Sequence, residues 1–179
     1  MGHGKVFLDT QVSSRKPFGI ESNTKSQEKG DYLLQNLEGI GYISKDAALS
    51  GHELIPKWKV TVSKVSFEHA GVPDKSGTMR VLSRITKLPP NSVCTETYLV
   101  AGVFDTEKEA ENFIIYLKTK TVRFLIAQAL ASMNMSKSSY MFVPIEDYKK
   151  LLTDKDLYTK YDLSEREIAH IESTIKEME

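Results

Sequence analysis

Basic and hydroxyl side chains of the kinds that contact DNA gather in two parts of this sequence. Lysine and arginine neutralise backbone phosphates, serine and threonine donate hydrogen bonds to them, and arginine can grip a guanine edge with two hydrogen bonds. The first group lies in a turn-rich stretch that ends at Pro17 and Gly19, and the second lies in the expected central strands. The candidate DNA-binding residues are Arg15, Lys16, Lys57, Lys59, Ser63, Lys64, Arg80 and Arg84.

Acidic residues suggest a second chemistry, the metal-dependent cleavage of a phosphodiester. Nucleases of this kind gather carboxylates and a lysine so that a cation polarises the phosphate and activates water. Asp74 would start such a site, but Arg80 and Arg84 follow it instead of a Glu-x-Lys pair. Glu146 and Asp147 have suitable side chains, yet they precede a helical stretch rather than end a strand. We therefore predict no catalytic or metal-binding residue, with a small nuclease domain as the alternative.

Other catalytic signatures are missing from the sequence. A DNA methyltransferase needs a glycine-rich turn for its cofactor and an Asn/Asp-Pro-Pro-aromatic stretch, and neither is present, nor is a glycine-rich phosphate-binding loop. Cys94 is the single cysteine, which excludes an internal disulfide and a multi-cysteine zinc site. His52, His69 and His170 lack the spacing of metal ligands. We expect the chain by itself to be non-catalytic.

The 179 residues have the composition of one globular domain, with 40% hydrophobic and 27% charged residues. The net charge is zero, but residues 1–137 hold 18 Lys and Arg against 14 Asp and Glu, whereas residues 138–179 hold 6 against 10. A basic body with an acidic tail suits a DNA-facing lobe with a partner-facing or solvated end. No apolar run approaches the roughly 18 residues that span a bilayer, and no secretory signal is recognisable. We expect a cytoplasmic protein with no membrane partner.

The hydrophobic pattern predicts an α+β fold with a mixed, mainly antiparallel sheet, two packed helices and a C-terminal helical tail. Loops are expected at residues 10–30 and 67–77, and a turn at 89–91. Helices are expected from Asp105 or Thr106 to Leu117 and from 122 to 133, and tail helices after Thr153 and Ser164. We divide the chain into a domain of residues 5–145 and a tail of residues 146–179 packed on or beside it. The predicted strands are residues 39–44, 58–65, 79–85, 95–104 and 140–144.

Residues 58–65 alternate between apolar and polar side chains, which is typical of a strand with one buried face. The apolar residues are predicted to face the core, and Lys59, Thr61 and Ser63 are predicted to face solvent. A β-bulge at Ser63-Lys64 would turn Lys64 outward and Val65 inward. The outer face would then be either a DNA-binding surface or simply a solvated one.

Several short stretches, taken in order, resemble the C-terminal part of fused bacterial restriction-modification enzymes. These enzymes are of the type IIG class and its relatives, in which one polypeptide holds an adenine-specific DNA methyltransferase and an endonuclease. The resemblance covers nearly the whole chain, although Leu152 stands where we expect a tryptophan. The stretches are VSSRKPFG (12–19), GYI (41–43), KVTVSK (59–64), CTETYLV (94–100), the region 104–125, FVP (142–144), TDKDLY (153–158) and IAHIES (168–173).

The resemblance implies that residues 5–145 are a target-recognition domain. It would bind double-stranded DNA and direct the methyltransferase and endonuclease domains of the parent enzyme, which would bind S-adenosylmethionine and magnesium, so that this chain holds no cofactor. Residues 65–90 match least, as the resemblance implies for a segment that differs between targets. We accordingly assign Lys59 and Lys64 to phosphates and Arg80 and Arg84 to bases. A protein-interaction module whose acidic tail docks a partner is a further alternative.

Overall fold

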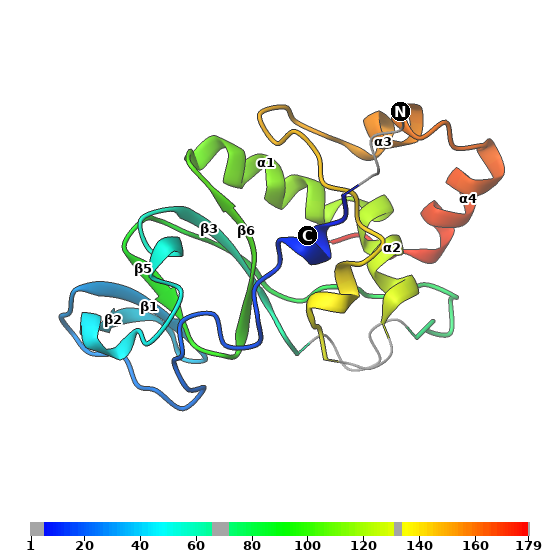
Figure 1. Cartoon of the computed structure of the whole chain (residues 1–179). Coiled ribbons are helices and arrows are strands. Elements are labelled where there is room, and N and C mark those ends of the chain that lie inside the picture. Colours follow the sequence, from blue (N-terminus) through cyan, green and yellow to red (C-terminus); the bar gives the residue numbers. More distant parts are fainter. Residues whose placement is uncertain (1–5, 66–71, 131–133, 179) are drawn as a thin grey trace.

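The computed structural model describes residues 6–65, 72–130 and 134–178. These residues form two three-stranded, mostly antiparallel sheets and four α-helices, which confirms the predicted α+β fold. In Figure 1 the smaller sheet lies at the left, the larger sheet stands beside it, and the helices occupy the upper and right-hand parts of the molecule. The larger sheet therefore lies between the smaller sheet and the helices.

The smaller sheet has the strand order β2-β1-β5, and the larger sheet has the order β4-β3-β6. In the first, β1 (Tyr32–Asn36) pairs antiparallel with β2 (Gly39–Ile43) and parallel with β5 (Ser92–Cys94). In the second, β3 (Trp58–Ser63) pairs antiparallel with β4 (Ile85–Leu88) and with β6 (Tyr98–Phe104). The strands β2 and β6 lie where the sequence predicts them. The strands β1 and β5 were not predicted, because such short stretches show no clear periodicity.

Both faces of β3 are covered. Val60 and Val62 belong to a hydrophobic core that the larger sheet shares with the helices α1 and α2. A second core lies between the two sheets and contains apolar side chains of β1, β4 and β6. Lys59 and Thr61 are fully buried as well. The prediction that these two polar side chains face solvent is therefore wrong, because a second sheet packs on the face that was expected to be open.

The pairing of β3 with β6 shifts register once. The shift is at Ala101, an extra residue of β6 that has no partner on β3. The bulge predicted at Ser63-Lys64 is therefore misplaced, since Ser63 stays in register with β6. Val65, which was predicted to turn inward, is exposed.

The helices α1 (Glu107–Lys118) and α2 (Lys120–Ala129) pack against the larger sheet. Thr106 caps α1 by accepting a hydrogen bond from the Glu109 N–H, which confirms the predicted start. The helix α2 begins before the predicted Val122, because the Thr119 hydroxyl accepts a hydrogen bond from the Val122 N–H and so forms the N-cap. Residues 131–133 of this predicted helix lie outside the described residues.

The tail contains α3 (Asp154–Lys160) and α4 (Glu165–Thr174). Both helices begin at the predicted positions, with capping boxes at Thr153 and Ser164. The tail packs on α2, where the Asp154 carboxylate accepts hydrogen bonds from the N–H groups of Lys120 at 2.9 Å and Thr121 at 2.8 Å. No helix in the described parts of the chain is long and apolar enough to cross a membrane.

Two predicted strands are wrong. Of residues 79–85 only Ile85 belongs to a strand, and Leu82 has a φ of 64°, which interrupts an extended backbone. Of residues 140–144, Tyr140 ends a short 3-10 helix, η4 (Lys137–Tyr140), which begins with a capping box at Ser136, and the rest form a turn and an isolated bridge at Pro144. Part of the loop predicted at 67–77 lies outside the described residues, and the remainder, residues 72–77, is irregular.

Candidate nucleic-acid interface

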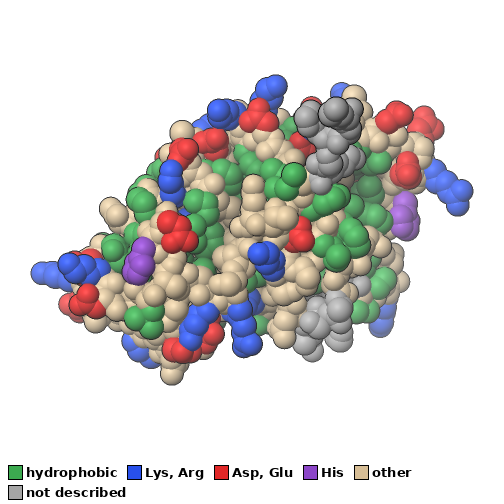
Figure 2. Space-filling model, in the orientation of Figure 1, with side chains coloured by type: hydrophobic (Ala, Val, Ile, Leu, Met, Phe, Trp, Pro, Cys, Tyr) green, Lys and Arg blue, Asp and Glu red, His purple; other side chains and the backbone are tan. Residues whose placement is uncertain are grey.

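A groove of about 700 Å³ opens where segments distant in the sequence meet. The segments are the stretch after the short helix η1 (Leu8–Thr10), the end of β3, the start of β6 and the residues that lead into η4. In the space-filling view, Lys and Arg side chains lie along both the upper and the lower edges of the molecule, with Asp and Glu side chains beside some of them (Figure 2). The groove is lined by Ser13, Arg15, Ser22, Leu37, Lys64, Val65, Glu96, Thr97, Leu99, Asn134, Met135, Ser136 and Lys137.

The ammonium of Lys64 lies among other charged side chains in this groove. Partial burial lowers the pKa of its ammonium, Glu96 opposes this shift, and the positive charges of Arg15 and Lys16 add to it. Charged side chains from two other segments therefore act on Lys64 here. Of the predicted DNA-binding residues, Arg15 and Lys64 both line the groove, whereas Lys16 forms an ion pair with Glu21 beside it.

Backbone hydrogen bonds hold the two basic residues in place. The N–H of Ser13 donates to the Val100 carbonyl at 2.9 Å, and the N–H of Val100 donates to the Ser13 hydroxyl at 3.0 Å, so the chain before Arg15 is fastened to β6. The N–H of Lys64 donates to the Thr97 carbonyl at 3.0 Å, and its carbonyl accepts from Met135 at 2.6 Å. Lys64 is thus held between the β6 side and the segment that leads into η4.

Lys137 is a groove residue that the sequence did not single out. It lies in η4, and its segment reaches the groove through an isolated bridge between Val65 and Asn134. The sequence signal was a lysine flanked by the hydroxyls of Ser136 and Ser138, which are residue types that contact phosphate. These residues lie between the predicted helix that ends at 133 and the predicted strand at 140–144, and no short-range pattern indicates which surface they join.

Lys59 is the main correction among the predicted site residues. Its side chain is fully buried, and its ammonium donates hydrogen bonds to the carbonyl oxygens of Leu54 at 3.0 Å, Ile55 at 3.0 Å and Lys57 at 2.7 Å. Burial lowers the pKa of this group to about 8. The ammonium supports the turn that precedes β3, and in this position it cannot reach a phosphate.

The remaining predicted residues do not share one face. Lys57 forms an ion pair with Asp105 at the opposite end of β3 from the groove. Arg84 is exposed, and its guanidinium donates to the Tyr98 hydroxyl at 3.4 Å, near the start of β6. Arg80 is exposed next to the backbone bridge that joins Met79 to the C-terminal tail. The hydroxyl of Ser63 donates to the Val65 carbonyl at 3.0 Å, at the edge of the groove.

The acidic candidates for a nuclease are dispersed. Asp74 is exposed, and hydrogen bonds from Ser76 and Thr78 lower the pKa of its carboxyl. The Glu146 side chain is only 3% exposed and is engaged by Lys160 and Tyr161, which ties the tail to the segment before it. Within the described residues, no group of three or more His, Cys, Asp and Glu side chains could hold a metal ion.

Cys94 lies in the core between the sheets. Its side chain is fully buried, and burial raises the pKa of the thiol to about 12. The protonated thiol is a poor nucleophile, since the thiolate is the reactive form. The residue therefore packs as a small apolar side chain.

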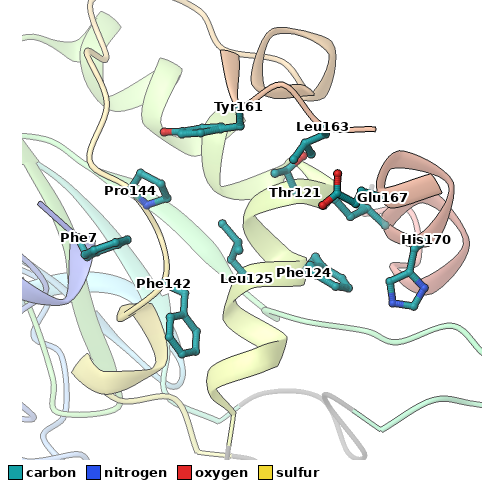
Figure 3. A pocket seen from close by; sticks show the side chains of 11 residues that line it. Phe7, Thr121, Phe124, Leu125, Phe142, Pro144, Tyr161, Leu163, Glu167 and His170 are labelled. Atoms are coloured by element: carbon teal, nitrogen blue, oxygen red, sulfur yellow. The ribbon is translucent and has the colours of Figure 1, made fainter. Parts of the chain in front are cut away.

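A second hollow, of about 440 Å³, lies on the helical side of the molecule (Figure 3). Phe7 and Phe142 line one side of it, and Phe124 of α2 lies across from them. Two of its polar side chains already have partners. The Glu167 carboxylate belongs to the capping box of α4, and the His170 ring stands edge-on to the Phe124 ring, with 5.5 Å between the ring centroids. The described residues that line it include no lysine or arginine, so this part of the surface does not extend the basic groove.

Comparisons with the known protein families, with curated protein sequences and with solved structures find no match to this chain. The likeness to type IIG enzymes consequently rests on the order of the short stretches described above. The role of the groove has to be argued from its own side chains.

Proposed function

We propose that this chain is a sequence-specific module for double-stranded DNA, which directs the adenine methyltransferase and endonuclease domains of a restriction-modification enzyme to their target. The observation that carries the proposal is the convergence of Arg15, Lys64 and Lys137 on one groove from three separate segments. Hydroxyl side chains of Ser13, Ser22, Thr97 and Ser136 line the same groove. This combination of side chains suits a phosphate backbone.

The environment of Lys64 makes it the strongest candidate for a phosphate contact. Its ammonium is partly desolvated and lies near like charges, and both effects lower its pKa. A phosphate would relieve the repulsion among the basic residues, and the attraction would be stronger than at a fully solvated lysine because less water screens it. The backbone anchors on either side of Lys64 hold the group in place before DNA arrives.

Base recognition is proposed for the segment that joins β3 to β4. Arg84 lies at its end, beside Tyr98 and therefore at the same end of the larger sheet as the groove. Arg80 precedes it and is also exposed, although Val81 and Leu82 between the two arginines are buried. Arginine forms two hydrogen bonds with a guanine edge, so these residues would select the sequence while the groove holds the backbone.

In this proposal S-adenosylmethionine and magnesium bind to the catalytic domains of the longer enzyme. The present chain then binds the DNA and fixes the position of the catalytic domains on it, and it takes no part in the reaction itself. Its contribution is seen by following which adenines the full-length enzyme methylates.

The binding proposal is tested by titrating duplex DNA at two salt concentrations. Lys64→Ala should weaken binding to every duplex and lower the slope of log K against log salt by about 0.9, because one phosphate contact is lost. Lys57→Ala is the matched control, since Lys57 lies at the other end of β3 and is paired with Asp105. Equal losses in the two variants, or no binding by the wild type, would overturn the proposal.

A further inference from the structure

Among the described residues that line the basic groove, Glu96 is the one acidic side chain. Its backbone N–H donates to the Ile20 carbonyl at 2.9 Å, and its Oε1 accepts a hydrogen bond from the Ser22 N–H at 3.4 Å. The neighbouring carboxylate of Glu21 is paired with Lys16, a contact that lowers the pKa of Glu21. Glu96 therefore brings negative charge into a groove that otherwise attracts phosphate.

A carboxylate in this position works against simple phosphate binding. Two like charges a few ångströms apart repel each other, so Glu96 lowers the affinity of the groove for a bare DNA backbone. Glutamate does have a favourable partner on DNA, because its oxygens accept a hydrogen bond from the exocyclic amino group of a base, cytosine above all. The described part of the groove thus offers cations for phosphate and, beside its neutral hydroxyl and amide groups, one charged acceptor for an amino group.

We propose that Glu96 is a specificity-determining residue, whose carboxylate accepts a hydrogen bond from the amino group of a base in the DNA target and disfavours DNA that lacks this base. This inference rests on the proposed function and names a contact within it. Lys64 and Arg15 hold the phosphates, and Glu96 faces the base edge between them. The charge of Glu96 makes unspecific binding weaker, which widens the difference between target and random DNA.

A purely structural role for Glu96 predicts a different outcome. In that case the side chain would only hold the Ser22 N–H and support the charge of Lys64. Glu96→Gln separates the two roles, because glutamine keeps an acceptor oxygen for the Ser22 N–H but replaces the charged second oxygen with an amide donor, which changes the base edges that it can pair with. Glu96→Asp keeps the charge and shortens the side chain by one methylene group.

The experiment selects duplexes from a random library with the full chain and sequences those that bind. The wild type should show a preference for cytosine or another amino-bearing base at one position, and Glu96→Gln should change the preference at that position, because its amide also donates, while other positions are unchanged. Glu96→Gln should bind random duplex roughly two- to five-fold more tightly, since one repulsive charge is removed. Glu96→Asp should keep the weak binding to random DNA and reduce the preference at that position.

Glu53→Gln is the control, because Glu53 is exposed and lies outside the groove. It should select the same sequences as the wild type with the same affinity. If Glu96→Gln keeps every preference of the wild type, the inference about Glu96 is wrong while the DNA-binding proposal survives. If the wild type selects no DNA, the proposed function itself fails.

Discussion

Thr61 of β3 and Gln35 of β1 connect the two sheets, since the Thr61 hydroxyl donates a 2.7 Å hydrogen bond to Gln35 Oε1. Both side chains are buried, and apolar residues of both sheets form the core around them. A buried acceptor that loses its donor cannot recover the bond from water, so such a pair stabilises only when both partners are present. The pair therefore favours one arrangement of the sheets over others.

Thr61→Val should lower the free energy of unfolding by about 1–3 kcal/mol, because valine has nearly the same shape and leaves the Gln35 acceptor without its donor. Gln35→Met should also destabilise the protein. The double variant should lose less than the two single losses combined, since the buried acceptor is gone with its donor. Urea denaturation of the four proteins measures this coupling, and strictly additive losses would show that the hydrogen bond contributes nothing.

Lys59 should make the stability depend on pH in the alkaline range. Burial lowers its pKa from 10.5 to about 8 in the folded protein, whereas the unfolded chain keeps the ordinary value. Between these values the unfolded state binds more protons than the folded state, so the contribution of Lys59 to stability rises with pH through this window. Below the window both states are charged, and desolvation of the ammonium costs at most about 3 kcal/mol.

The comparison of the wild type with Lys59→Met isolates this effect, because the tyrosines that titrate in the same range are common to both proteins. The stability of the wild type relative to the variant should increase by up to about 3 kcal/mol between pH 8 and pH 10.5. Denaturation at several pH values measures the difference. A difference that does not change with pH would mean that the ammonium is not destabilised by its burial.

Arg84→Ala should reduce the binding of target DNA more than that of random DNA. A two-bonded contact between arginine and guanine discriminates by about 1–3 kcal/mol, whereas the loss of one phosphate contact weakens all sequences alike. The sites methylated by the full-length enzyme carrying this change report the preference. Unchanged site choice in Arg84→Ala and in Arg80→Ala together would refute the assignment of these residues to bases.

Lys137→Ala should weaken binding to every duplex by a similar factor and lower the salt slope by about one. The reason is that Lys137 lines the groove and is exposed, so its ammonium can approach a phosphate. Lys155→Ala in α3 is the control, since this exposed lysine lies outside the groove. Equal binding by wild type and Lys137→Ala would remove η4 from the proposed interface.

Local signals in the sequence predict the helices well. Thr106 and Ser164 mark the starts of α1 and α4, because a capping side chain acts on backbone groups only three residues away. The alternation in β3 was recognised too, but its burial was not. Alternation indicates one buried face, and a polar residue on the other face is exposed only when nothing packs there. Lys59 is buried because a second sheet, whose strands β1 and β5 were not predicted, covers that face.

The groove was predictable only in part. The residue types of Arg15 and Lys64 suggested a role, but their meeting depends on the hydrogen bonds of Ser13 with β6 and of Met135 with Lys64. These contacts join segments that are far apart in the sequence, and no short-range pattern reports them. Lys57 and Lys59 have the same residue type as Lys64, yet one lies at the other end of the strand and the other lies in the core.

The segment that joins β3 to β4 leaves the larger sheet and returns to it at neighbouring positions, because Val62 of β3 is paired with Ile85 of β4. Its later part is anchored, since Leu82 is buried and Met79 bridges to Ile175 in the tail. The described end of this segment, before β4, is therefore held from two sides, by the larger sheet and by the C-terminal tail. In the proposed DNA module, the segment that carries Arg80 and Arg84 is thus braced at both ends, so that the two arginines would meet the bases from a fixed position.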